Sequence, residues 1–448
     1  MCMFYRLLLL YGILFLPFLV VAQDAPTTLR LSLNEARALA IKNNPILQAK
    51  DLDIQVSKEV TAQARLKRIP QVYGDFNLQR NLIIPVTPVP ANAFNRDAPE
   101  GELLPLRFST KWTANTGINA SIDLFNPLKK QDVKEAGIQE GISKLKKENE
   151  ENRLYFDVSN AYAMALISKE QLKLSIADTL TKSRILKMSQ EQFEAGRLTL
   201  TELNVVKADQ NNTLSNYEET LNISRNAMAQ LLYYLGFDPV VEMSIELSDD
   251  IESLFLAYQD QMTLDSSQSY AYKNLQQNEL LINTQIDGAK AGYLPVLTLN
   301  AFYGANYFDN NFKMFKSANW TGNSFMNVGV SVPITQGLDR QKKINQLKLQ
   351  KVANALAYKN QLHKNRLDFL EASREAEFYE KKYRRTKENY KLAGDNFRIA
   401  EDQFENGRLL IADLYKSNYS YQQEKTNYLN VAYDYIQAKI KIYNISRN

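Results

Sequence analysis

Apolar residues follow two different periods along this chain. In long segments they recur at heptad spacing, as at Leu172, Leu186 and Phe193, and this spacing predicts long helices that pack as coiled coils. In four shorter segments apolar and polar residues alternate, which predicts strands with one apolar and one polar face. We place these strands at residues 71–80, 114–125, 296–305 and 324–334.

The same order of elements occurs twice. The segment Glu191–Leu198 (EQFEAGRL) returns as Asp402–Leu409 (DQFENGRL), and the heptads on both sides correspond as well. Internal similarity of this kind is typical of a duplicated structural unit. Each copy is predicted to run helix, strand, strand, helix, helix. The first copy is longer because of a loop between Leu78 and Trp112.

The repeat divides the chain into three parts. A leader and two structural repeats are predicted at residues 1–22, 23–236 and 237–448. The helical hairpins that close the repeats are predicted at 128–235, with its tip at 196–200, and at 338–445, with its tip at 407–411. At ~1.5 Å per residue the longest helices reach about 100 Å, which exceeds a globular domain. A coiled-coil rod is the competing interpretation, and the strands argue against it.

A helix opens each repeat, at Ser32–Arg68 and at Ser267–Tyr293. In the first copy Ser32 is placed to be the N-cap, and Glu35 three residues later completes a capping box. A proline follows each helix and is expected to end it.

The leader resembles a secretory signal peptide. Arg6 is followed by the apolar segment Leu7–Val21, and the small residues Val20 and Ala22 precede a polar pair. An uncleaved anchor helix is the alternative. The single cysteine, Cys2, lies inside this leader, so we expect neither disulfides nor thiol chemistry in the exported chain.

The alternating strands suit a transmembrane barrel with its polar face toward the lumen. The two tryptophans, Trp112 and Trp320, stand next to the second strand of each pair, where a membrane-interface aromatic girdle would lie. A soluble sheet packed on helices fits the same alternation. Four strands cannot close a barrel, and open edges are not tolerated in lipid, so insertion requires several copies of the chain.

The sequence shows no constellation for catalysis. The only histidine, His363, has no partner at ligand spacing, so no metal site is expected. No glycine-rich phosphate loop is present, and we predict neither an enzyme nor a cofactor. The formal net charge is +4, and the lysine-rich segments also carry glutamates, so we expect no nucleic acid partner.

In its whole length after the leader, the chain resembles the TolC family of outer-membrane efflux proteins. The resemblance rests on the duplicated order, the two glycine-containing helix turns, and three short motifs: Leu33–Ala36 (LNEA), Asn44–Leu47 (NPIL) and Leu294–Pro295. It implies a mainly α fold with a small β part. It also implies a homotrimer with a twelve-stranded β-barrel in outer-membrane lipid, continuous with a long periplasmic α-helical barrel.

The resemblance also implies a site at the helix turns. In the family these turns contact a periplasmic membrane-fusion adaptor, which links to an inner-membrane pump. The adaptor-contact candidates in this chain are Gly196, Arg197, Leu198, Gly407, Arg408 and Leu409.

The family also narrows its periplasmic tip with rings of acidic residues. Glu202 and Asp413 align with these acids, whereas Lys416 replaces the next one. Phe404 and Leu409 stand where the family has its gate-locking aromatic and arginine. Glu202, Asp413 and Phe404 are therefore the gate candidates, and the closing contacts are expected to differ from those of the family.

The predicted function is an outer-membrane exit duct for a tripartite efflux or type I secretion system, passively conducting its substrate. The alternative is a non-transporting, envelope-spanning coiled-coil protein with a structural or adhesive role.

Overall fold

The computed structural model is mostly helical and describes residues 29–240, 245–258, 264–265, 267, 269–335 and 337–447. The predicted signal peptide, 1–22, lies outside these residues. The chain forms two compact units, which we describe separately. The sheet unit contains residues 45–153 and 262–372, and the hairpin unit contains residues up to 44, 154–261 and 373–443.

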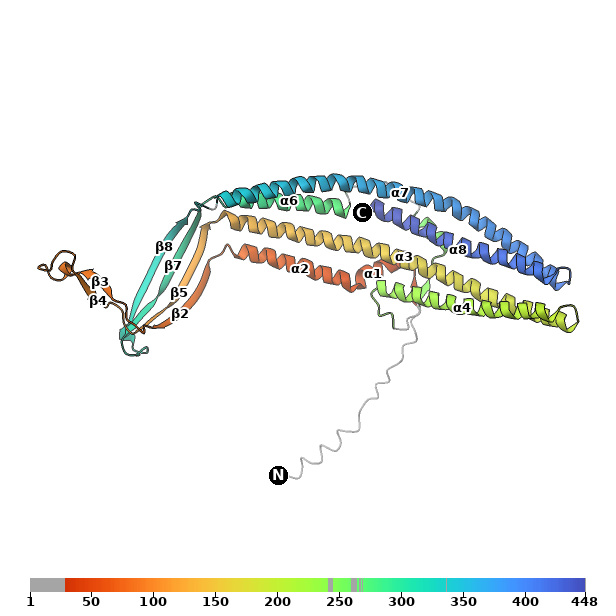
Figure 1. Ribbon diagram of the computed structural model, residues 1–448, viewed down its shortest axis with the longest axis horizontal. Coiled ribbons are helices and arrows are strands. Elements are labelled where there is room, and N and C mark those ends of the chain that lie inside the picture. The colour runs from red at the N-terminus through yellow and green to blue at the C-terminus, as the bar shows by residue number, and fades with distance from the viewer. Residues whose placement is uncertain are drawn as a thin grey trace, which may run out of the picture. The chain divides into compact units, whose positions relative to one another are not determined.

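Four long helices are the largest elements of the fold. Their bounds are α3 (Pro127–Glu194), α4 (Leu200–Tyr234), α7 (Gly337–Glu405) and α8 (Ile411–Arg447) (Figure 1). Both α3 and α7 contribute residues to the two units. Among the described residues, none of the helices is both long enough and apolar enough to cross a membrane.

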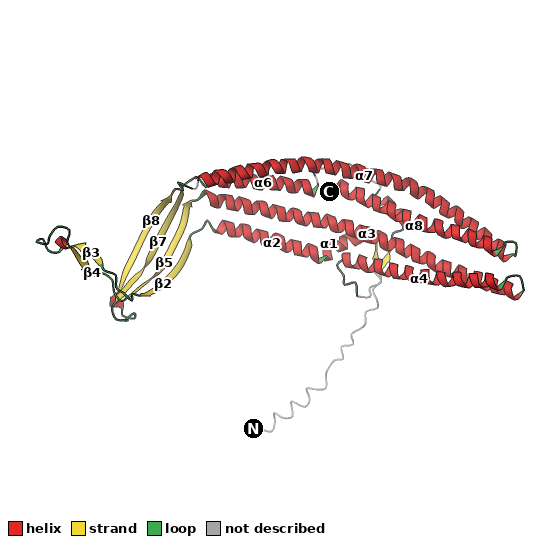
Figure 2. Ribbon diagram, viewed as in Figure 1, coloured by secondary structure: helices red, strands yellow, loops and turns green. Residues whose placement is uncertain are grey.

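The sheet unit contains one four-stranded antiparallel sheet with the order β2-β5-β7-β8 (Figure 2). Its strands are β2 (Gln71–Arg80), β5 (Trp112–Phe125), β7 (Val296–Asp309) and β8 (Trp320–Ser331). The two repeats contribute two strands each, and the central pair β5–β7 joins them. The outer strands β2 and β8 each have one edge that pairs with no other strand among the described residues.

The two faces of the sheet differ in chemistry. On one face, apolar side chains are exposed on all four strands, for example Phe76, Ile118, Tyr303 and Val328. The other face carries a hydrogen-bonded ladder of small polar groups. In this ladder the amide of Asn115 donates to Asn306 at 2.7 Å, Ser121 to Asn300 at 2.7 Å, and Asn300 to Asn327 at 3.2 Å.

Two helices precede the strands, α2 (Pro45–Leu66) and α6 (Tyr270–Ala291). The segment that lengthens the first repeat contains a small hairpin of two further strands, where the sequence analysis expected only a loop. These are β3 (Thr87–Pro90) and β4 (Leu103–Leu106), with a short 3-10 turn, η1 (Ala91–Ala93), between them. A second such turn, η2 (Ser317–Asn319), precedes β8.

The first predicted helix is wrong in its extent. Instead of one helix over Ser32–Arg68, the chain forms α1 (Leu33–Asn43) and then α2, with a break at Asn44. Asn44 adopts an extended conformation, with φ −66° and ψ 121°, because the ring of Pro45 disfavours a helical residue before it. Pro45 then starts α2, where its missing N–H costs nothing.

Three strand predictions also need correction at their ends. The strand predicted at 296–305 continues to Asp309 in β7. The last strand was placed at 324–334, but β8 ends at Ser331, because Pro333 has no N–H to donate to a neighbouring strand. The tryptophans are the first residues of β5 and β8 rather than residues before these strands.

The hairpin unit also contains short elements that the hydrophobic pattern did not reveal. They are β1 (Leu29–Leu31), β6 (Ile245–Leu247) and α5 (Ile251–Leu256), and β1 pairs with β6 in parallel. The capping box of Ser32 and Glu35 at the start of α1 is confirmed.

The buried Arg37 of α1 fastens this region to the long helices. Its guanidinium donates to Ser159 Oγ at 3.0 and 2.9 Å and also to the Tyr258 hydroxyl. It lies 3.8 Å from the ring centre of Tyr155, an arrangement in which the positive charge is attracted to the ring face. Arg37 therefore ties α1 to α3 and to the residues that follow α5.

Candidate functional site: the helix turns of the hairpin unit

The turn between α3 and α4 is built around Gly196. The Gly196 N–H donates to Phe193 O at 2.9 Å, and the Arg197 N–H donates to Gln192 O at 2.8 Å. This pair of hydrogen bonds is the Schellman ending of a helix, which needs a left-handed residue at its glycine position. Gly196 has φ +71°, a conformation that costs other residue types energy.

The turn between α7 and α8 repeats this geometry. The Gly407 N–H donates to Phe404 O at 3.0 Å, the Arg408 N–H donates to Gln403 O at 2.8 Å, and Gly407 has φ +68°. The duplicated Gly-Arg-Leu motif thus encodes the same helix ending twice. Its glycines serve the turn itself, whatever contacts the other residues make.

The two turns differ in how the next helix begins. Thr199 caps α4, since its hydroxyl accepts from the Glu202 N–H at 3.3 Å while the Glu202 carboxylate accepts from the Thr199 N–H at 2.8 Å. In the second repeat Leu410 occupies the position of Thr199. It offers no side-chain cap, and Asp413 and Leu414 donate only to its backbone oxygen.

A hydrophobic cluster lies beneath both turns and joins the hairpins. Its buried members are Ile185, Leu198, Leu203, Val206, Phe397, Ala400, Phe404, Ile411 and Leu414. Leu198, predicted to offer its side chain to a partner, is only 9% exposed and packs in this cluster. Phe404, a gate candidate, is buried in the same cluster because it continues the apolar seam of α7, and Leu198 reaches the cluster from the turn itself.

The exposed apolar side chains at the turns are Leu200 and Leu410, which the sequence analysis did not select. Leu410 is 72% exposed, and Arg197 and Arg408 are also exposed. Leu409 is half-buried against the cluster. The signal for Leu410 was present in the sequence as a leucine at a position where the other repeat has the capping residue Thr199. A hollow of 460 Å³ lies between the turns, with Gln192, Arg197, Glu202, Phe404 and Leu410 among its lining residues.

The acidic gate candidates have different surroundings. The backbone and hydroxyl hydrogen bonds from Thr199 lower the pKa of the Glu202 carboxyl. This carboxylate therefore has a structural role as a cap. Asp413 is exposed on the first turn of α8, and Lys416 is exposed one turn further along.

Two buried ion pairs lie near the hydrophobic cluster. Lys182 of α3 is bonded to Asp209 of α4 at 2.7 Å, and Lys425 of α8 pairs with Asp178 of α3. The amide of Gln422 also donates to Asp178, at 3.2 Å. Charges of this kind fix the register of neighbouring helices, because leaving one partner buried alone is costly. The second pair fastens the two hairpins to each other.

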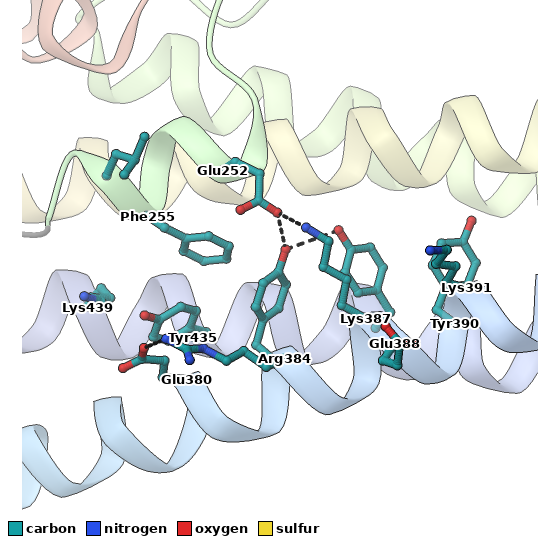
Figure 3. A pocket seen from close by; sticks show the side chains of 13 residues that line it. Glu252, Phe255, Glu380, Arg384, Lys387, Glu388, Tyr390, Lys391, Tyr435 and Lys439 are labelled. Carbon is teal, nitrogen blue, oxygen red and sulfur yellow. Dashed lines mark hydrogen bonds and ion pairs between the residues drawn. The ribbon is translucent and has the colours of Figure 1, made fainter.

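A larger hollow of 980 Å³ lies where α5 meets α7 and α8 (Figure 3). Glu252 of α5 accepts from Lys387 and from the Tyr383 hydroxyl, both at 2.7 Å, and the hydrogen bond from Lys387 lowers the pKa of the Glu252 carboxyl. Beyond it, aromatic rings of α7 and α8 lie 5.2–5.8 Å apart in a continuous ladder: Tyr435, Tyr383, Tyr428, Tyr390, Tyr421 and Phe397. These contacts hold helices together.

No catalytic or metal-binding arrangement is evident in the described part of the chain. Within it, no group of three or more His, Cys, Asp or Glu side chains is placed to hold a metal ion.

The two tryptophans lie at one end of the sheet, on its apolar face. Trp112 packs against Phe312 at 4.8 Å and beneath the Arg80 guanidinium at 5.3 Å. Trp320 lies 5.4 Å from Tyr307, and its indole N–H donates to Met314 O at 2.8 Å. The strand register places Trp112 opposite Arg80 and Trp320 opposite Tyr307. The two indoles therefore lie on the same face of the sheet, one on each of two neighbouring rows.

The sequence matches no protein-family model and no curated protein sequence. The fold does match solved structures. The outer membrane protein VceC of Vibrio cholerae superimposes with a TM-score of 0.68 at 14% identity, covering 93% of this chain and 96% of that one. The CmeC outer membrane channel of Campylobacter jejuni gives 0.70 at 16% identity, with 93% and 85% covered. The MtrE outer membrane channel of Neisseria gonorrhoeae gives 0.66 at 15%, with 93% and 89% covered.

This chain therefore has the fold of the outer-membrane channel proteins, over nearly all of its length. The resemblance to the TolC family is confirmed at the level of the fold.

The turn glycines give a first prediction. In Gly407→Ala the new Cβ meets no atom within 4 Å, so only the left-handed backbone is penalised, and we expect a loss of about 1 kcal/mol. Gly137 lies inside α3, also with open space around it, so Gly137→Ala should stabilise by ~0.5–1 kcal/mol. Thermal unfolding of the detergent-solubilised protein measures the change in stability for both variants. Equal changes would contradict the left-handed conformation assigned to Gly407.

The capping box gives a pH-dependent prediction. Because the pKa of Glu202 is lowered in the folded protein, its contribution to stability is complete above the ordinary glutamate pKa of 4.5 and is lost as the pH falls through the lower, folded-state pKa. Hydrogen exchange of a peptide spanning residues 196–206 should show that wild type is better protected than Glu202→Gln at pH 7. The difference should shrink as the pH falls below 4.5 and through the lower, folded-state pKa, and a difference that grows on acidification would refute the capping role of Glu202.

Proposed function

We propose that this protein is an outer-membrane channel that serves as the exit duct of an efflux or type I secretion system. The observation that carries the proposal is the four-stranded sheet, with two open edges and an exposed apolar face, in a chain that has the outer-membrane channel fold. A soluble protein would bury such a face in its core.

The open edges supply the reason for assembly. Unpaired N–H and C=O groups cannot remain in a hydrocarbon environment, so β8 of one copy is proposed to pair with β2 of the next. Three copies give a barrel of twelve strands. The apolar face then meets lipid, the ladder of Asn and Ser side chains lines a water-filled lumen, and the indoles of Trp112 and Trp320 lie at a membrane interface.

The helix turns are the proposed docking site for a periplasmic adaptor, which in turn engages an inner-membrane pump. The exposed Leu200 and Leu410 offer apolar contact area, and Arg197 and Arg408 beside the turns offer charge. Coiled-coil partners recognise this combination of apolar side chains flanked by charged ones. Energy for transport would come from the pump, and the channel would conduct passively.

Asp413 is the proposed acidic group of the entrance, because its carboxylate is exposed at the start of α8. Repeated in three copies it would form a ring of negative charge, which favours cations in a narrow pore. Glu202 is a weaker candidate, since its carboxylate already accepts the hydrogen bonds of the cap.

Conductance tests the channel. The purified oligomer in a planar bilayer should carry a cation-selective current, and Asp413→Asn should move the reversal potential in a salt gradient toward zero. Glu218→Gln, which removes an exposed carboxylate on α4 away from the turn, is the matched control and should leave the potential unchanged. If the wild-type oligomer carries no current, the protein is not a channel and the structural or adhesive role is the better account.

Photo-crosslinking tests the docking site. A photoreactive residue at Leu410 or Leu200 should capture a periplasmic adaptor in intact cells, identified by mass spectrometry. The same residue at the buried Leu198 should capture none and is the control for accessibility. Capture from Leu198 alone, or from none of the three positions, would rule out docking at these turns.

A further inference from the structure

One row of the sheet departs from the polar character of its face. The strand register aligns Tyr73, Asn119, Phe302 and Phe325 across β2, β5, β7 and β8. Alternation places these residues on the same face as the hydrogen-bonded Asn and Ser side chains. Three of the four are aromatic, so an aromatic band crosses an otherwise polar surface.

Part of the band is closely packed against the sheet. The rings of Phe302 and Phe325 are stacked, with centroids 5.5 Å apart and an interplanar angle of 26°. Phe302 is only 7% exposed, because its ring lies over the backbone of two glycines that face each other in the register, Gly117 and Gly304. A Cβ on Gly117 would lie 2.5 Å from this ring, and one on Gly304 would lie 2.7 Å from it.

These glycines are unfavourable inside strands, since they lose entropy and offer no side chain to pack. Covering them with an aromatic ring is a known way to restore the packing of a sheet. That role accounts for Phe302. It does not account for Phe325, which is 50% exposed, or for the exposed ring of Tyr73.

A carboxylate lies at the β2 end of the band, next to Tyr73 on the same strand. Asp75 occupies the next row on the same face, in register with Gly117, which in turn pairs with Gly304. It accepts a hydrogen bond from the amide of Asn119, a member of the aromatic row. Aromatic ring faces stack with flat rings, and both the ring faces and the carboxylate attract positive charge. The row therefore suits flat aromatic cations.

We propose that the row of Tyr73, Phe302 and Phe325, with Asp75 next to Tyr73 at its β2 end, forms a binding subsite within the pore for flat aromatic cations in transit. The inference rests on the proposed function, because it takes the polar face of the sheet as the wall of the lumen. In three copies the subsite becomes a ring of stacking surfaces. Cargo would exchange between these surfaces and water as it passes.

Block of the channel current tests the subsite. N-methylacridinium, a flat aromatic cation, should block the oligomer in a planar bilayer at lower concentration than tetramethylammonium, which has the charge without the rings. It should also block at lower concentration than naphthalene-2-sulfonate, which has the rings with the opposite charge. Phe325→Leu should raise the half-blocking concentration of N-methylacridinium about three- to tenfold, the worth of one stacking contact.

Phe308→Leu is the matched control. Phe308 is 49% exposed on the same face of β7 but outside the row, so its variant should keep the wild-type block. Asp75→Asn should reduce the preference for the aromatic cation over the aromatic anion, and the ring faces and Asp413 should retain the rest of it. If Phe325→Leu does not assemble, Tyr73→Ser tests the same row at another exposed ring.

The outcomes separate the two proposals. Two results from a conducting wild-type channel would overturn the subsite and leave the channel proposal intact. The first is equal block by the three probes. The second is a block that Phe325→Leu does not change or, where that variant does not assemble, that Tyr73→Ser does not change. Absence of any wild-type current overturns the channel, and the subsite with it.

Discussion

The open edges of the four-stranded sheet are the constraint on which the rest of this structure depends. Strands β2 and β8 leave one row of backbone donors and acceptors each without a partner in the chain, and the exposed side chains of one face are apolar. A single copy is therefore suited neither to water, because of its exposed apolar face, nor to lipid, because of its unpaired strand edges. The duplication gives this sheet its form, because the central pair β5–β7 takes one strand from each repeat, and β2 and β8 are left as equivalent ends. Closure by further copies resolves both the edges and the apolar face at once.

The two repeats have kept their backbone and diverged in side chains. Both turns end in the same Schellman hydrogen bonds, with Gly196 and Gly407 in nearly the same conformation. In the first repeat Thr199 and Glu202 cap the next helix, so the carboxylate is committed to structure. In the second, Leu410 is exposed in place of the cap and Asp413 keeps its carboxylate in solvent. The hairpin of α7 and α8 is also held by a ladder of aromatic rings. The first turn thus uses its polar side chains for capping, whereas the second leaves an apolar side chain and a carboxylate exposed.

Periodicity revealed the elements that are long enough to display it. The ranges assigned to the four long helices agree with those observed to within one or two residues at each end, because a heptad pattern over many turns has no competing explanation. The three-residue strands β1 and β6 are too short for any period, and prolines hide β3 and β4. At the turns the glycines of the repeated motif predicted the helix endings, but the pattern did not show which leucine is exposed. Leu198 packs into the buried cluster from the turn, whereas Leu410 is exposed at the position of a cap. That distinction depends on the three-dimensional path of the turn.

Phe302 breaks the polar alternation of β7, and Gly117 and Gly304 break the preference of strands for branched and aromatic residues. Each departure looks unfavourable alone, and together they explain one another, because the ring fills the space that the glycines leave. Places where a sequence departs from local rules, and compensates for it nearby, are where function is to be expected. The compensation here covers Phe302 but leaves the stacked ring of Phe325 half exposed on β8, and at the other end of the row Tyr73 is exposed beside Asp75 on β2. If the polar face lines the pore and contacts only water, an exposed aromatic ring on it has no purpose. The aromatic row therefore supports the proposal that transported molecules contact this face.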